Sequence, residues 1–113
     1  MTTVTPGIHA VPGRVLLFRR FLGEALRSRR MSRGMTLRQV SASALVSLGY
    51  ISEVERGQKE ASSELLASLC AALDASLSEV LRDVSDAVAL EEEAVALIAE
   101  AQASAPDVVA SAA

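Results

Sequence analysis

The sequence is poor in the residues that mark several common classes of protein. Its 113 residues include one cysteine, one histidine, three aromatic residues and no tryptophan. The single cysteine, Cys70, excludes an internal disulfide framework, and a zinc site built from a His/Cys cluster has too few ligands. No apolar run approaches the roughly 18 residues of a membrane span, and the N-terminus lacks a secretory pattern. These absences predict a cytoplasmic protein with no membrane partner, metal or cofactor.

Alanine, leucine and strongly separated charge are what the chain has instead. Half of the residues are apolar, and an alanine- and leucine-rich composition favours helices. Residues 1–59 hold ten Lys/Arg and three Asp/Glu, whereas residues 60–113 hold one and eleven. A basic first half is typical of a protein that binds a polyanion, although two solvated faces of an ordinary domain would give the same balance.

Apolar residues recur at three- and four-residue steps, which predicts an all-α fold of five helices. A flexible arm is expected at residues 1–13. Gly57 is well placed to adopt the left-handed conformation that ends a helix. The first predicted helix spans about residues 14–30 and has Phe18 on its apolar face. The next three are 37–44, 48–56 and 64–73, with N-caps at Thr36, at Ser47, and at Ser62 or Ser63. The last helix is predicted to begin near Ser78, with Leu77 packed beneath it.

The last helix is predicted to be long, because no helix breaker occurs between Glu79 and Pro106. We assign residues 82–104 to a C-terminal helix that dimerises and residues 105–113 to a flexible tail. The apolar spacing approaches a heptad seam that a second copy would cover; the alternative is a helix folded back on its own domain. The residues expected at the dimer contact are Val84, Val88, Val95 and Ile98.

The stretch "MTLRQVSASALVSLGYISEVERG", residues 35–57, resembles the phage-repressor-type (Xre) helix-turn-helix family. The longer run "LVSLGYISEVERGQKEASSELLASLCAALDASLSEVL" is more narrowly similar to the actinobacterial Clp gene regulators, which activate Clp protease genes. The resemblance implies a five-helix phage-repressor-like domain at residues 14–81 with an extended C-terminal helix. It implies a DNA-binding transcription regulator and no enzyme, so no catalytic residue is assigned. The matching positions are Thr36, Val40, Ser41, Ser47, Ile51, Ser52, Glu55 and Gly57.

Two departures from the family pattern concern the turn and the helix that follows it. Many members have glycine where this chain has Leu45, which leaves open a turn of a different shape. Phage repressors often carry glutamine where this chain has Leu48 and Gly49, so adenine reading by glutamine is not available there.

The resemblance also implies roles for individual residues. The helix 48–56 is expected in the major groove, with Arg38, Arg56 and Lys59 on phosphates and Arg14, Arg19 and Arg33 adding to the positive field. Arg30 and Glu55 are expected to form a structural ion pair. The residues predicted to contact double-stranded DNA are Arg38, Ser47, Leu48, Gly49, Tyr50, Ser52, Glu53, Arg56 and Lys59.

Three of these assignments keep an alternative. Gly49 either permits close approach of DNA or is merely tolerated in a first helical turn. Tyr50 either contacts DNA or packs on the rim of helix 37–44. Glu53 either accepts a hydrogen bond from a cytosine amino group or orients a nearby arginine.

Partners beyond DNA are predicted from the apolar last helix, from the resemblance to activators, and from a C-terminal end that resembles tags read by Clp-type proteases. We expect a homodimer on a pseudo-palindromic operator, contact with RNA polymerase, and recognition of the C-terminal "VVASAA" by Clp protease, for which a meaningless frayed end is the alternative. The competing function is an antitoxin-like or anti-regulator module that uses its acidic last helix to bind a protein.

Overall fold

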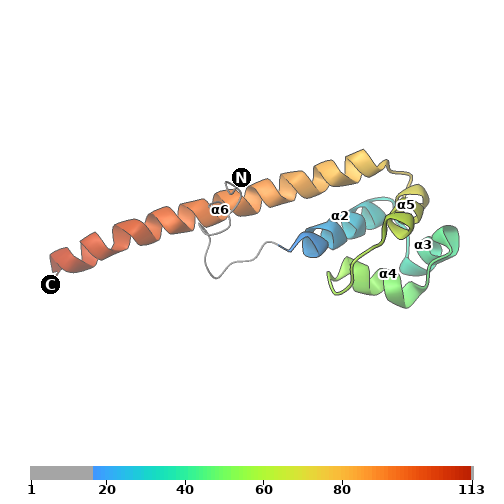
Figure 1. Ribbon diagram of the computed structural model, residues 1–113, viewed down its shortest axis with the longest axis horizontal. Coiled ribbons are helices and arrows are strands. Elements are labelled where there is room, and N and C mark those ends of the chain that lie inside the picture. The colour runs from blue at the N-terminus through green and yellow to red at the C-terminus, as the bar shows by residue number, and fades with distance from the viewer. Residues whose placement is uncertain (1–16, 113) are drawn as a thin grey trace, which may run out of the picture. The chain divides into compact units, whose positions relative to one another are not determined.

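A computed structural model describes residues 17–112, with side chains from Leu17 to Ser104. This part of the chain contains five helices and no strand (Figure 1), which confirms the predicted all-α fold. Residues 17–87 form one compact unit and residues 88–112 belong to another, so each is described by itself. No helix among the described residues is long and apolar enough to cross a membrane. The helices are α2 (Phe18–Ser32), α3 (Leu37–Ala44), α4 (Leu48–Glu55), α5 (Ser63–Ala72) and α6 (Leu77–Ala112).

Serine and threonine caps set the starts of the later helices. Thr36, Ser47 and Ser62 each accept a hydrogen bond from the backbone N–H three residues later, at 3.1, 3.1 and 3.2 Å. At α6 the Ser76 hydroxyl accepts from the Glu79 N–H at 3.1 Å, and the Glu79 carboxylate accepts from the Ser76 N–H at 2.9 Å. These side chains satisfy N–H groups that the first turn of a helix leaves unpaired.

One predicted helix start and one predicted packing contact are wrong. α2 begins at Phe18, because Leu17 has the extended backbone of an N-cap residue; residues 14–16 lie outside the described part of the chain. α6 begins at Leu77, next to the expected start near Ser78, because Ser76 is its cap. Leu77 was expected to pack beneath the helix, but its side chain is 46% exposed.

The core of the compact unit is formed where α4 packs against α2 and α3 and α5 packs against α3. Phe18 was expected on the buried face of the first helix, but it is 54% exposed because it lies at the very start of α2. Cys70, on the apolar face of α5, is buried, and burial raises the pKa of its thiol. The buried apolar residues are Phe21, Leu22, Ala25, Leu26, Val40, Val46, Ile51, Val54, Leu69, Cys70, Leu73, Val80 and Val84.

Two glycines allow α2 to approach the α4 region closely. A Cβ built on Gly23 would lie 2.3 Å from the Val54 carbonyl oxygen, so α2 meets the end of α4 through bare backbone. A Cβ on Gly57 would lie 2.9 Å from Arg20 Cα, and its φ of +74° confirms the predicted left-handed conformation. Sequence reasoning did not single out Gly23, although this contact positions α4 on the compact unit.

The last helix extends further at its C-terminal end than expected, and the compact unit includes more of it. The compact unit includes α6 as far as Ala87, beyond the boundary at residue 81. The helix end expected near residue 104 is wrong, since α6 continues to Ala112 and contains Pro106. Proline removes one helical hydrogen bond, but alanine-rich flanks retain high helix propensity. The arm at residues 1–13 lies outside the described residues.

Candidate nucleic-acid interface

α3 and α4 are joined by a turn whose first residue is Leu45. Leu45 has the left-handed φ of 60° and ψ of 43° and is 90% exposed. The next residue, Val46, is buried, and its carbonyl accepts a hydrogen bond from the Ser41 hydroxyl at 2.6 Å. A leucine therefore adopts the left-handed conformation that glycine usually provides, at a cost of about 1 kcal/mol.

The inner face of α4 is buried and its opposite face is open. Ile51 and Val54 are 2% and 1% exposed, whereas Leu48 and Gly49 at the start of the helix are exposed. A Cβ built on Gly49 meets nothing within 4 Å. No contact within the described chain therefore requires glycine at this position.

Tyr50 and Arg56 are already bonded within the chain. The Tyr50 hydroxyl donates to the Glu60 carbonyl oxygen and ties α4 to the connection before α5, a contact that neither sequence alternative included. Arg56 donates through Nη1 to the Ser52 hydroxyl and through Nη2 to Gln58 at 3.4 Å. Arg56 is exposed, and neither of its partners carries a charge.

The arginines divide into those paired with acids and those without an acidic partner. Arg19 and Arg33, which the sequence placed in the positive field, lie 3.8 Å from Glu60 and 3.6 Å from Asp74, so each has an exposed acidic partner. Arg14 lies outside the described residues. Among the described residues before α6, the cations without an acidic partner are Arg27, Arg38, Arg56 and Lys59.

Arg27 and Arg56 line a groove of about 710 Å³ between α2 and α4. Sequence reasoning missed Arg27 as a candidate. The position of Gly23 could have indicated Arg27. Residues four apart share a helix face, so Arg27 lies one turn beyond the glycine that contacts α4. The other residues lining the groove are Arg20, Glu24, Arg30, Leu37, Ser52, Glu55 and Gln58.

Arg30 and Glu55 form a bidentate pair at the edge of the core. Arg30 Nε and Nη2 donate to the two Glu55 carboxylate oxygens at 2.7 and 2.9 Å, and Nη1 donates to the Met35 carbonyl at 2.9 Å. The side chains are only 11% and 7% exposed. Hydrogen bonding to Glu55 raises the pKa of Arg30. Through these bonds Arg30 of α2 holds both α4 and the segment that precedes α3, so the pair has a structural role.

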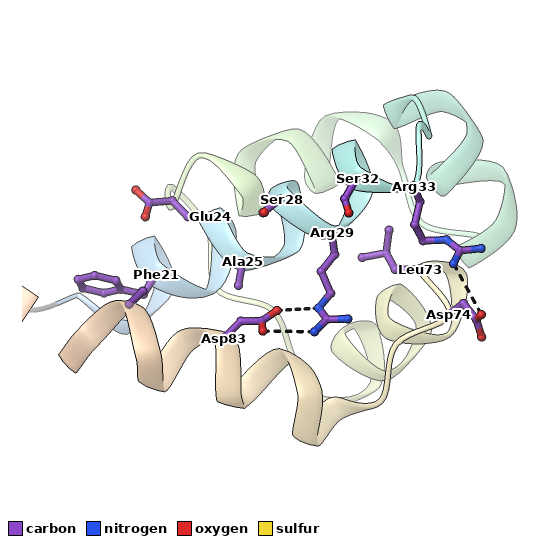
Figure 2. A pocket seen from close by; sticks show the side chains of 11 residues that line it. Phe21, Glu24, Ala25, Ser28, Arg29, Ser32, Arg33, Leu73, Asp74 and Asp83 are labelled. Atoms are coloured by element: carbon purple, nitrogen blue, oxygen red, sulfur yellow. Dashed lines mark hydrogen bonds and ion pairs between the residues drawn. The ribbon is translucent and has the colours of Figure 1, made fainter. Parts of the chain in front are cut away.

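A second groove, of about 560 Å³, lies on the side of α2 that faces the first turns of α6. Figure 2 shows Arg29 of α2 reaching Asp83 of α6, with hydrogen bonds of 2.6 and 3.2 Å that raise the pKa of Arg29. At the other end Arg33 faces Asp74 (Figure 2). Both arginines of this groove have acidic partners, which distinguishes it from the groove beside α4.

The residues predicted at the dimer contact have different environments. Val84 is 4% exposed and belongs to the core of the compact unit, so its assignment to a dimer contact is wrong. Val88 and Val95 are half-buried, and Ile98 is 48% exposed. Leu97 is 61% exposed, which adds a large apolar side chain to this stretch of α6.

Comparison with known proteins identifies relatives of both the fold and the sequence. Residues 26–80 match the family described as Helix-turn-helix. The transcriptional regulator ClgR of Mycobacterium tuberculosis is 57% identical over 76 residues, which cover 67% of this chain and 68% of the relative. The crystal structure of the clp gene regulator ClgR from Corynebacterium glutamicum has a TM-score of 0.69 and 48% identity, covering 77% of this chain and 95% of that one. The restriction-modification controller protein C.AhdI from Aeromonas hydrophila follows with a TM-score of 0.54 and 27% identity, covering 55% and 94%.

The capped α3, the turn at Leu45 and α4 define a helix-turn-helix protein. This arrangement and the matched sequence together cover most of the compact unit. The chain belongs to the ClgR family of helix-turn-helix transcriptional regulators. The protein is therefore a DNA-binding regulator of transcription and not an enzyme.

Proposed function

We propose that the chain binds a pseudo-palindromic operator as a homodimer and activates Clp protease genes. The link to Clp genes comes from the relative described as the clp gene regulator of C. glutamicum. Activation, as opposed to repression, comes from the resemblance of residues 45–81 to regulators that activate such genes.

The unpaired cations around α4 are the observation that carries DNA binding. Arg38 stands at the start of α3, Arg56 follows α4, Lys59 lies in the connection after it, and Arg27 faces α4 across the groove. Other arginines of α2 are matched by acids. With the start of α4 in the major groove, the unpaired cations are available for the flanking phosphates.

Salt dependence tests this assignment. The operator is first selected from random duplex DNA, and affinity is then measured by fluorescence anisotropy at several salt concentrations. Arg27→Gln and Arg38→Gln should each reduce the slope of log affinity against log salt by about 0.9, the value for one phosphate contact. Arg33→Gln is the control and should leave the slope unchanged, because Arg33 is paired with Asp74. A protein that binds no duplex at low salt would refute the proposal.

Dimerisation is assigned to residues 88–104 of α6. This stretch exposes Leu97 and Ile98, and a second copy is the partner that would place two α4 helices about 34 Å apart, one turn of B-DNA. Ile98→Glu should shift the protein toward monomer in sedimentation velocity and weaken binding to the full operator more than to a half-site. Ala99→Glu adds the same charge one residue away at another exposed position and should retain more dimer.

RNA polymerase and Clp protease complete the proposed partners. Contact with polymerase predicts that the purified protein stimulates transcription from a promoter carrying the selected operator. The tail assignment lies outside the described side chains, and changing Ala112 and Ala113 to Asp tests it: an unchanged half-life in cells would exclude it.

An antitoxin-like module is the competing function. The exposed apolar side chains of residues 88–104 favour it, since they could bind a different protein. Such a module would need its partner to bind DNA, so tight operator binding by the purified chain alone would exclude it.

A further inference from the structure

Most polar side chains of α4 already have a hydrogen bond within the chain. The Ser47 hydroxyl accepts from the Tyr50 N–H, the Tyr50 hydroxyl donates to Glu60, and the Ser52 hydroxyl accepts from Arg56. A serine or threonine hydroxyl contacts several bases, whereas discrimination between base pairs comes mainly from bidentate side chains. The hydroxyls of α4 therefore offer little means of choosing one base pair.

Leu48, Gly49 and Glu53 are the residues on the outer face of α4 whose side chains make no hydrogen bond within the described residues. Leu48 at the first helical position is 37% exposed, and the space over Gly49 is open. The Glu53 carboxylate makes no hydrogen bond or ion pair within the described residues. The tip of α4 is therefore apolar and without a side chain at one position, and its free acid stands one turn further along.

Glycine at residue 49 has a cost and no benefit within the described chain. It is about 1 kcal/mol less favourable than alanine inside a helix, and a Cβ there would meet nothing within 4 Å. The space over Gly49 is therefore open to a group from outside the described residues. Beside it stands Leu48, whose exposed side chain offers an apolar surface and no hydrogen-bonding group.

We propose that Leu48 and the bare backbone of Gly49 form a recognition site for the 5-methyl group of a thymine in the operator. The proposal rests on the proposed function and adds the chemistry by which one base pair is chosen. Thymine alone presents a methyl group in the major groove of unmodified DNA, and apolar side chains contact it. The missing Cβ at Gly49 lets that methyl approach the helix while the leucine side chain covers it.

Uracil substitution tests the proposal, because deoxyuridine differs from thymidine only by the missing methyl group. Each thymine of the selected operator is replaced in turn by deoxyuridine, and affinity is measured by anisotropy. At one symmetry-related position the replacement should lower the affinity about fourfold per half-site, because one methyl group is withdrawn from an apolar contact. At that position 5-methylcytosine should bind more tightly than cytosine by a similar factor.

Variants assign the effect to the side chain. Leu48→Ala should bind thymine and uracil operators equally at that position. Leu45→Ala is the matched control: Leu45 is 90% exposed but lies in the turn before the helix, so this variant should keep the fourfold preference for thymine. Circular dichroism establishes that both variants are folded.

The outcomes separate this inference from the proposed function. Binding to no duplex at all would refute DNA recognition itself. Operator binding with no thymine position sensitive to uracil, or with a sensitivity that Leu48→Ala retains, would overturn only the methyl site.

Discussion

Residues 17–87 and residues 88–104 are both helical, yet different forces stabilise them. In the first region Val54, Leu69 and Val80 are no more than 2% exposed. In the second, Leu90 and Leu97 are 68% and 61% exposed. The charges differ as well, because the first region contains nearly all the arginines, whereas residues 88–104 contain four glutamates and no lysine or arginine.

The difference shows that helical structure by itself does not indicate a packed domain. Most helical stability in proteins comes from tertiary packing of an apolar face, and only the first region shows such packing among its own residues. The second region has alanine-rich helix propensity and apolar side chains left to contact a partner. Stability and DNA binding are therefore expected to respond to changes in the first region, and association to changes in the second.

The sharpest test of the packed region is Gly23→Ala. The new methyl group would lie 2.3 Å from the Val54 carbonyl oxygen, and backbone on both sides prevents easy relief. We expect a loss of more than about 3 kcal/mol in the free energy of unfolding, beyond the usual range for overpacking, measured by urea denaturation. Gly49→Ala is the control, since its Cβ meets nothing and it should unfold no more easily than wild type.

One substitution made in both regions compares them directly. Leu69→Ala removes a side chain that is 2% exposed and should cost about 3 kcal/mol of unfolding free energy, as large-to-small core changes do. Leu97→Ala, at a residue that is 61% exposed, should leave the unfolding of the monomer nearly unchanged and weaken self-association. Equal effects on monomer unfolding would show that the two regions do not differ in packing.

The ion pairs give a smaller effect that depends on burial. Arg30→Gln breaks the pair with Glu55, whose side chain is 7% exposed, and should cost about 2 kcal/mol by leaving a buried carboxylate without its donors. Arg33→Gln breaks an exposed pair at 3.6 Å and should cost less than about 0.5 kcal/mol. Thermal unfolding of both variants, with calorimetric enthalpies, measures the difference.

The cap of α6 predicts a still smaller effect that depends on pH. Hydrogen bonding from Ser76 to the exposed Glu79 carboxylate, assisted by Arg29 and Arg82, lowers the pKa of Glu79. A carboxyl group with a lowered folded-state pKa stabilises the fold above its unfolded pKa, and this contribution is lost as pH falls through the folded value. Glu79→Gln should therefore flatten the acid side of a profile of Tm against pH. Glu64→Gln, in the first turn of α5 but one residue short of the position that Glu79 occupies in α6, is the matched control.

Features decided by nearby residues were predicted well from the sequence. The caps at Thr36, Ser47 and Ser62 and the left-handed Gly57 agree with the structure. Each depends on hydrogen bonds or backbone angles within a few residues, so local sequence is sufficient. The errors at Phe18 and Leu77 concern residues at helix starts, where an apolar side chain can be exposed without altering the apolar pattern. The error at the end of α6 arises because alanine-rich flanks continue the helix through Pro106.

The candidate site was only partly predictable. Leu48, Gly49 and Glu53 were placed on the outer face of α4, and the structure leaves Leu48 and Gly49 exposed and Glu53 half-buried. Arg27 was missed, and Arg19 was expected to add to the positive field although Glu60 lies 3.8 Å away. Sequence distance hides such pairs, because charge neutralisation depends on which acids the fold brings near.

The sequence alone determined the helical class, the positions of the caps, the separation of basic and acidic halves, and the family motif. Only the tertiary structure decided that Gly23 is a contact point, that Val84 belongs to the core, and that Arg27 is unpaired while Arg29 is paired with Asp83. The reason is physical: helix propensity and capping act over a few residues, whereas burial and ion pairing depend on groups that meet only after the chain has folded.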